Sequence, residues 1–171
     1  MPLNCAPVLL FTLVCESLSR YSPSRPARIP PASVTPPAGS PSLEYRMYLF
    51  TAGDAQVNAI LSPSLNFMPG RGVRLAVSFD DRPPQIVEAV PKDFVAGDRN
   101  REWEESVKNS ARTVASTHKI DKPGYHTLKI WMVDPDVPIQ KIVVNLGGLK
   151  PSYLGPPESH FGTRLHPVMR M

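Results

Sequence analysis

The sequence predicts an all-β fold, an antiparallel β-sandwich of the jelly-roll or immunoglobulin-like kind with one short helix. Apolar residues recur at every second position in several short segments separated by turn residues, which is the period of strands with one buried face. Proline accounts for 21 of the 171 residues, and proline interrupts helices. A single segment shows a helical period. Together these observations exclude an all-helical domain.

The length and the charge of the chain limit what it can do. A chain of 171 residues with 42% hydrophobic residues can build one core, but not a two-domain enzyme. The formal net charge of +4 comes from the two ends, because residues 43–159 hold fourteen basic and fourteen acidic side chains. A neutral domain lacks the concentrated basic face that nucleic acid binding requires. We therefore predict no nucleic acid partner.

Residues 1–21 contain an apolar run from Ala6 to Cys15. A run of about ten residues is too short to cross a bilayer as a helix, so we predict no membrane partner. The run fits the core of a signal peptide without its usual basic flank, or the frayed start of an incomplete chain. Only a signal peptide would imply an extracellular or periplasmic location, and the compartment stays open. Both cysteines, Cys5 and Cys15, lie within residues 1–21, which leaves the domain without thiolate chemistry.

Residues 22–42 hold seven prolines, five serines and one glycine. This composition favours extended conformations and cannot bury enough apolar surface to fold. We predict a disordered linker over residues 22–42, a β-sandwich domain over residues 43–159 and a tail over residues 160–171.

The expected elements of the domain follow from their periods. Residues 43–50 and 57–61 alternate around Gly53 and Asp54, which predicts a hairpin. A helix is expected to begin near Asn100 and to end by Ser110. Its apolar stripe comprises Trp103, Val107 and Ala111, with acidic residues in the first turn. Further strands are expected over residues 73–79, 86–90, 113–120, 125–133 and 139–145, with a type II turn at residues 122–125 in which Pro123 and Gly124 are central.

Three segments in the C-terminal half form a specific pattern. They read PGYHTLKIWMVDP at residues 123–135, QKIVV at residues 140–144 and GGLKPSYLGPPES at residues 147–159. The pattern resembles the C-terminal domain of glycoside hydrolase family 115, the xylan α-1,2-glucuronidases. LSPSLNF at residues 61–67, VSFDD at 77–81 and NREW at 100–103 also fit. Asp136 and Pro138 depart from the family pattern, and Pro138 should lie at a strand edge or a bulge.

The resemblance implies a β-sandwich that follows the catalytic domains of a large enzyme, which removes glucuronic or 4-O-methylglucuronic acid from xylan. The family's catalytic carboxylates lie in an upstream barrel domain, so the resemblance assigns no catalytic residue to this chain. It implies as partners the upstream catalytic domains or a second subunit, since enzymes of the family are typically dimeric. We predict no cofactor for this chain.

The acidic pairs of the domain have structural explanations. Asp80 and Asp81 are neighbours at a strand end, where they would point to opposite sides, whereas glycosidases need two carboxyl groups facing one bond. Asp134 and Asp136 offer oxygen ligands to calcium but lack the spaced loop of a known site. We therefore expect no catalytic carboxylate pair, and a calcium site remains the minor alternative.

The histidines also give no defined site. His118 and His126 flank the expected turn, and a symmetric hairpin would bring them together. Zinc needs at least a third ligand, which the sequence does not identify, so a cross-strand pair or two solvent-facing histidines fit better. Neither a nucleophile elbow nor a phosphate-binding loop occurs. We expect no catalytic residue and no metal site.

Three aromatic residues are the candidates for a surface contact or a sugar contact, because a ring can cover the apolar face of a pyranose. Trp131 shares a strand face with Lys129, opposite Leu128, so it should point away from the interior or pack under a loop. Trp103 fits an anchor onto the sheet better than a sugar platform. Tyr153, among prolines and glycines, fits a surface contact best.

The sequence thus supports two hypotheses of different kinds. The first is a noncatalytic accessory domain that docks against catalytic domains or a second subunit, through an apolar patch near Tyr153 and the linker. The alternative is a carbohydrate-binding module for xylan or glucuronoxylan, with an exposed ring in a groove. An intact enzyme, the third possibility, requires a pocket that holds two carboxyl groups.

Overall fold

A computed structural model describes residues 9–11, 35–36, 39–97, 99–150, 155–157, 159 and 168–170. Most of the expected N-terminal segment, linker and tail lie outside the described residues, as do both cysteines and Tyr153. In the part that is described, no helix is long and apolar enough to cross a membrane.

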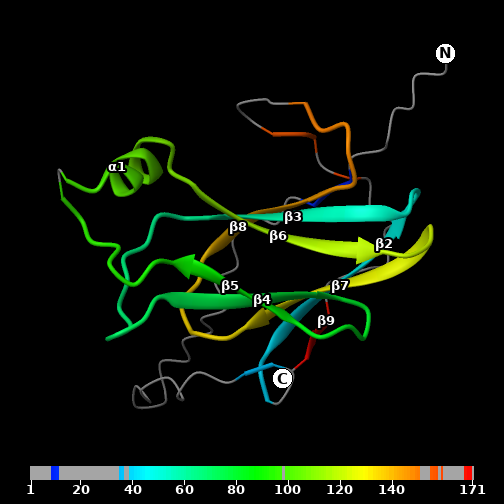
Figure 1. Ribbon diagram of the computed structural model, residues 1–171, viewed down its shortest axis with the longest axis horizontal. Coiled ribbons are helices and arrows are strands. Elements are labelled where there is room, and N and C mark those ends of the chain that lie inside the picture. The colour runs from blue at the N-terminus through cyan, green and yellow to red at the C-terminus, as the bar shows by residue number, and fades with distance from the viewer. Residues whose placement is uncertain are drawn as a thin grey trace.

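Two antiparallel sheets face each other, and helix α1 (Arg101–Lys108) lies beyond one end of them (Figure 1). The four-stranded sheet has the order β1 (Leu9–Phe11), β8 (Ile139–Asn145), β3 (Gly53–Leu61), β6 (Arg112–Ile120). The five-stranded sheet has the order β5 (Gln85–Val90), β4 (Val73–Phe79), β7 (Gly124–Met132), β2 (Ser42–Leu49), β9 (Val168–Arg170). The predicted all-β sandwich with one short helix is confirmed.

The core lies between the sheets, and the expected alternation fills it. Every second residue of the long strands points inward and is almost fully buried, while its neighbours face outward. Phe79, at the end of β4, is the largest completely buried side chain. The inward set includes Tyr45, Met47, Leu49, Ala55, Val57, Ala59, Leu61, Val73, Leu75, Val77, Phe79, Leu128, Ile130, Ile142 and Val144.

The expected hairpin between residues 43–50 and 57–61 is wrong. β2 pairs with β7 and β9 in one sheet, whereas β3 pairs with β6 and β8 in the other. The short connection after Leu49 therefore crosses from sheet to sheet. A hairpin and such a crossing bury the same alternate residues, so the period of the sequence does not distinguish them.

The connection at residues 122–125 also crosses between the sheets. Its glycine, Gly124, has a φ of 142°, a positive value that glycine adopts without strain. β6 pairs with β3 and β7 pairs with β2 and β4, so His118 and His126 do not face each other across a hairpin. The expected cross-strand histidine pair is wrong for this reason.

Helix α1 begins where the sequence predicted. The side-chain oxygen of Asn100 accepts a hydrogen bond from the backbone N–H of Trp103 at 3.2 Å and caps the first turn. Trp103 packs against the core, but Val107 is 49% exposed and Ser106 is the buried residue of the helix. The helix therefore turns Trp103 and Ser106, three residues apart, toward the core. The expected apolar stripe is wrong beyond Trp103.

Two further details concern the strand ends. Pro138 precedes β8, next to a register shift between Ile60 and Leu61 of β3, as expected for a proline that departs from the family pattern. The three-residue strands β1 and β9 were not predicted, because a segment of three residues shows no period.

Candidate functional site

One end of the sandwich is formed by α1 together with the loop of residues 62–72 and the segments 91–97 and 99–100 (Figure 1). Four apolar side chains at this end are exposed to between 42% and 63%: Leu65, Phe67, Val95 and Val107. We call these four residues the apolar patch. Exposed aliphatic and aromatic side chains of this size cost free energy in water, which favours a site that a partner covers.

Asn66 holds the two loops in fixed positions. Its amide nitrogen Nδ2 donates hydrogen bonds to the carbonyl oxygens of Arg71, at 2.8 Å, and Lys92, at 2.6 Å. Its Oδ1 accepts from the backbone N–H of Met68 at 2.9 Å. Because both amide hydrogens and the oxygen are used, the loop conformation is specified and does not depend on a partner.

Trp103 packs α1 against the core. Its indole ring meets the ring of the buried Phe94 edge-on, with centroids 5.9 Å apart. The guanidinium of Arg112 lies over the Phe94 ring, 4.6 Å from its centroid. The structure thus places Trp103 partly in the core, where it also borders a surface hollow.

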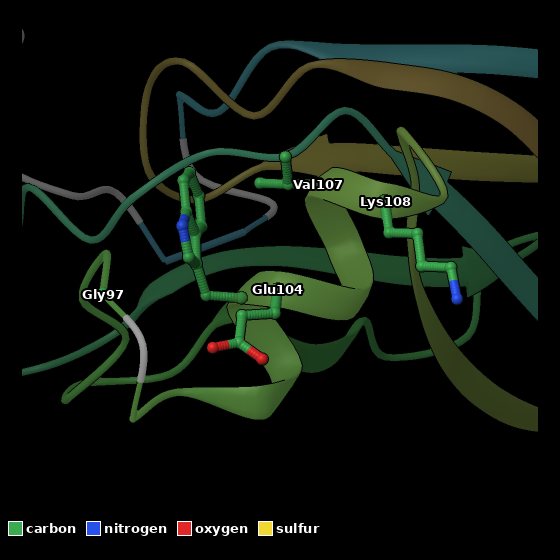
Figure 2. Close-up of a pocket in the computed structure, with 5 residues that line it drawn as sticks. Gly97, Glu104, Val107 and Lys108 are labelled. Atoms are coloured by element: carbon green, nitrogen blue, oxygen red, sulfur yellow. The ribbon is translucent and has the colours of Figure 1, made fainter.

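The hollow beside α1 has a volume of about 450 Å³ and is lined by Gly97, Trp103, Glu104, Val107 and Lys108. Figure 2 shows that Glu104 and Lys108 project in different directions from the helix, while Gly97 lies on the loop across from it. A second open hollow, of about 950 Å³, adjoins residues 91–102. Its acidic residues include Glu102, which forms an ion pair with Arg112 at 3.1 Å.

Trp131 lies on the outer face of the five-stranded sheet. It stands between Ser42 of β2 and Ala76 of β4, while its neighbour Ile130 is buried in the core. Its Nε1–H donates a hydrogen bond to the hydroxyl of Ser78 at 2.8 Å. Trp131 is only half-buried, but its polar edge is already bonded within the domain.

At the opposite end of the sandwich from α1, three aromatic side chains gather on the outer face of the five-stranded sheet. Tyr48 of β2 lies directly opposite Tyr125 of β7, with ring centroids 5.1 Å apart, and Phe50 follows at 5.0 Å from Tyr48. The guanidinium of Arg46 covers the Tyr125 ring at 4.5 Å. We call these four residues the aromatic cluster.

The sequence reasoning missed the aromatic cluster. Tyr48 and Phe50 both occupy the outward, polar positions of the first alternating segment, and large rings in such positions were a usable signal. Tyr125 joins them only through the pairing of β2 with β7, which the wrong hairpin had excluded.

Asp80 and Asp81 are neighbours at the end of β4. Asp80, with a φ of 53°, accepts hydrogen bonds from the backbone N–H of Thr127 at 2.9 Å and from His126 at 2.8 Å, while the side chain of Asp81 is fully exposed. Desolvation would raise the pKa of Asp80, but the hydrogen bonds from His126 and Thr127 lower it on balance. The carboxyl groups of Asp80 and Asp81 therefore lie in different surroundings, as expected.

Asp134 is completely buried and ion-paired. It accepts two hydrogen bonds from the guanidinium of Arg71, at 2.6 Å and 2.7 Å, and one from the backbone N–H of Arg74 at 2.8 Å. Desolvation would raise the pKa of the Asp134 carboxyl, but the hydrogen bonds from both arginines lower it. With its oxygens committed to arginine, Asp134 is a poor calcium ligand. Within the described ranges, no three acidic, histidine or cysteine side chains cluster as metal ligands would.

A serine and a histidine also meet inside the sandwich. The hydroxyl of Ser116 lies 2.9 Å from Nε2 of His118, whose ring packs edge-on against Phe79. Burial, with a smaller effect of the Arg82 charge, lowers the pKa of His118 below its ordinary value of 6.5. Neither residue lines either hollow.

Comparison with known proteins places the domain. The model of the glycosyl hydrolase family 115 C-terminal domain matches residues 16–158. The chain belongs to this family. The match starts before residue 43, where the predicted β-sandwich domain begins, and it includes both the apolar patch and the aromatic cluster. No curated protein matches the chain.

A solved structure shares the fold of this family 115 domain. It is a family 115 4-O-methyl-α-glucuronidase with specificity for decorated arabinogalactans. The superposition has a TM-score of 0.53 at 18% sequence identity. It covers 63% of this chain and 13% of that enzyme. The chain thus corresponds to a small part of the length of the solved glucuronidase.

Two surfaces of this family 115 domain expose groups of large apolar side chains. The apolar patch beside α1 is mainly aliphatic, whereas the aromatic cluster at the other end combines rings with a cation. Their different chemistry suits different partners.

Proposed function

We propose that this family 115 domain is a noncatalytic accessory domain of a larger xylan-debranching glycosidase, and that its apolar patch docks against the catalytic domains of that enzyme. The exposure of Leu65, Phe67, Val95 and Val107 on loops that Asn66 fixes is the observation that carries the docking role. A preformed apolar surface loses little conformational entropy on binding, which favours a stable contact.

The noncatalytic role is supported by the acidic residues. The buried carboxylate of Asp134 is held by Arg71 and Arg74, and Asp80 is held by His126 and the Thr127 N–H. Hydrolysis of a glycosidic bond needs one carboxyl group free to give a proton and another free to act on the opposite side. The purified chain should release no glucuronic acid from glucuronoxylan; release that Asp80→Asn abolishes would contradict this part.

The activity of the parent enzyme belongs to the same proposal. We propose that the parent enzyme releases glucuronic acid side groups from xylan. The solved relative is a glucuronidase with specificity for decorated arabinogalactans, so it supports the type of reaction more directly than it supports xylan as the substrate. Parallel assays of the parent enzyme on glucuronoxylan and on a decorated arabinogalactan separate the two substrates.

Docking is tested with separately produced catalytic domains of the proposed parent enzyme. Immobilised catalytic domains should bind the chain in a biosensor experiment, and Phe67→Ser should weaken binding about tenfold, since a few central apolar side chains dominate interfaces. Thr117→Ser, on the outward side of β6, is the matched control and should bind normally. Equal binding by Phe67→Ser would contradict docking through this patch.

A second subunit is the competing partner for the same patch. Sedimentation velocity of the chain alone distinguishes it, because a dimer that Phe67→Ser converts to a monomer would assign the patch to a second copy. A monomer at all concentrations leaves the catalytic domains as the partner.

A further inference from the structure

The rings of the aromatic cluster are largely exposed to solvent. Tyr48, Phe50 and Tyr125 are 42%, 58% and 67% exposed, and they lie on the outer face of the five-stranded sheet. In Figure 1 the connections from β2 to β3 and from β6 to β7 lie at the end away from α1, and the cluster residues lie in or close to these two connections. Solvent-exposed rings at neighbouring positions stabilise a sheet only slightly, so the pairing of strands does not account for three of them.

Arg46 gives the cluster its charge. Its guanidinium stacks on one face of Tyr125, and among the ion pairs of the described residues none includes Arg46. Stacking leaves the edge of the guanidinium plane, which carries the N–H donors, open for a ligand. Two parallel N–H groups of an arginine match the two oxygens of a carboxylate.

The geometry points to a binding site for an acidic polysaccharide, in which the rings of Tyr125 and Phe50 take up the apolar faces of sugar rings and Arg46 binds a uronic acid carboxylate. A uronic acid residue presents both chemistries at once, an apolar pyranose face and a carboxylate, within the size of one sugar. The tyrosine hydroxyls at the edge of the cluster can exchange hydrogen bonds with sugar hydroxyls.

The composition of the cluster favours a glycan over a protein. It contains no aliphatic side chain, whereas the apolar patch at the other end holds leucine and valine. The rings meet at interplanar angles of 68° and 83°, so they form a corrugated surface with ring faces in different orientations. Such a surface suits successive sugars of a twisted chain. Tyrosine and arginine are also common in protein interfaces, and the test includes that outcome.

This inference is independent of the proposed docking role, because the cluster and the apolar patch lie at opposite ends of the sandwich (Figure 1). The probes are soluble glucuronoxylan and the same polymer with its carboxyl groups reduced to alcohols. Calorimetric titration of the full chain, at an ionic strength of about 0.15 M to suppress nonspecific attraction, measures the association constant for each. We expect the acidic polymer to bind about tenfold more tightly than the reduced polymer.

Matched variants separate the ring contacts from the charge. Tyr125→Ala should lower the association constant for both polymers about tenfold, and Phe67→Ala, which removes an exposed ring at the other end, should leave it unchanged. Arg46→Gln should abolish the preference for the acidic polymer while retaining binding of the reduced one. Arg99→Gln removes an equal charge near α1 and should preserve the preference. Near-ultraviolet circular dichroism verifies that each variant is folded.

Three results would overturn the inference. Absence of saturable binding of glucuronoxylan by the wild-type chain rejects the site. Equal loss of acidic preference in Arg46→Gln and Arg99→Gln assigns the effect to net charge. A dimer of the chain that Tyr125→Ala dissociates, without glycan binding, assigns the cluster to a second copy. A failure of docking at Phe67 leaves these readouts unaffected.

Discussion

Asp134 and Arg71 form a two-pronged ion pair in which a completely buried carboxylate accepts 2.6 Å and 2.7 Å hydrogen bonds from one guanidinium. The pair connects the loop that enters β4 to the loop that leaves β7. Because desolvated charges depend on their partners, removing one member should cost more free energy than an exposed pair would.

Asp134→Asn should therefore destabilise the domain. We expect a loss of about 2–3 kcal/mol in the free energy of unfolding, less than the ~3–5 kcal/mol typical of a fully buried pair, because both arginines retain contact with water. Urea denaturation near neutral pH measures it. Asp136→Asn, at an exposed position of the same loop, is the control and should change stability little. Equal stability of the two variants would show that the pair contributes nothing net.

The same pair predicts a loss of stability in acid. The hydrogen bonds from the arginines lower the pKa of Asp134 in the folded protein, so the unfolded chain takes up the proton first as the pH falls. The contribution of Asp134 is then complete above its ordinary pKa of 3.8 and is lost below it. The stability difference between the wild type and Asp134→Asn should shrink as urea titrations move from about pH 6 to about pH 3. A constant difference would contradict this assignment.

His118 predicts a second pH dependence, at higher pH. Burial lowers the pKa of His118 in the folded state, so the unfolded chain binds a proton more readily than the folded domain does. Stability should therefore fall as the pH drops through about 6.5, the ordinary pKa of histidine. His118→Gln should show a smaller fall between about pH 8 and about pH 5.5, measured by urea denaturation. An identical fall in the variant would assign the effect to another group.

Gly72 is predicted to be intolerant of any side chain. A Cβ atom at this position would overlap the carbonyl oxygen of Val90 and the carboxylate of Glu88, and the backbone carbonyl cannot move without disturbing the pairing of β4 with β5. Gly72→Ala should lower the free energy of unfolding by about 1–3 kcal/mol. Thermal unfolding measures the change, with Thr113→Ala at an exposed position of β6 as the control.

Asn66 is predicted to control the order of the apolar patch. Asn66→Ala removes three side-chain hydrogen bonds, to Met68, Arg71 and Lys92, and leaves the backbone contact with Phe94. Hydrogen exchange in residues 62–72 and 91–97 should accelerate about tenfold, while β7 stays protected. Ser64→Ala in the same loop is the control. Unchanged exchange would mean that packing, and not Asn66, fixes the loops.

The sequence predicts which residues face the core but not which strands pair. Alternation placed Tyr45, Val57 and Leu75 inside correctly, because burial on one face of a strand imposes a period of two. The pairing of β2 with β7 depends on contacts between segments about eighty residues apart, which no local pattern encodes.

For the candidate sites too, the sequence predicts local features but not contacts that depend on strand pairing. The positions of Trp103 and Trp131 could be anticipated from the helix cap and the strand period. The aromatic cluster could not, because Tyr48 and Tyr125 meet only once the strands are paired. The exposure of Val107 could not be predicted either, since the core it was expected to meet lies on the side of Ser106. Tyr153 remains a prediction.

The chain between β2 and β8 changes sheet at every connection except the one from β4 to β5. Consequently, β3 obtains one of its two neighbours only when residue 145 has been made, since β8 completes that pairing. When the nascent chain has emerged from the ribosome only as far as β7, β8 is missing and the four-stranded sheet is incomplete. We expect stalled chains ending before residue 139 to be digested readily by protease, and chains extended past the end of β8 to become resistant in a single step.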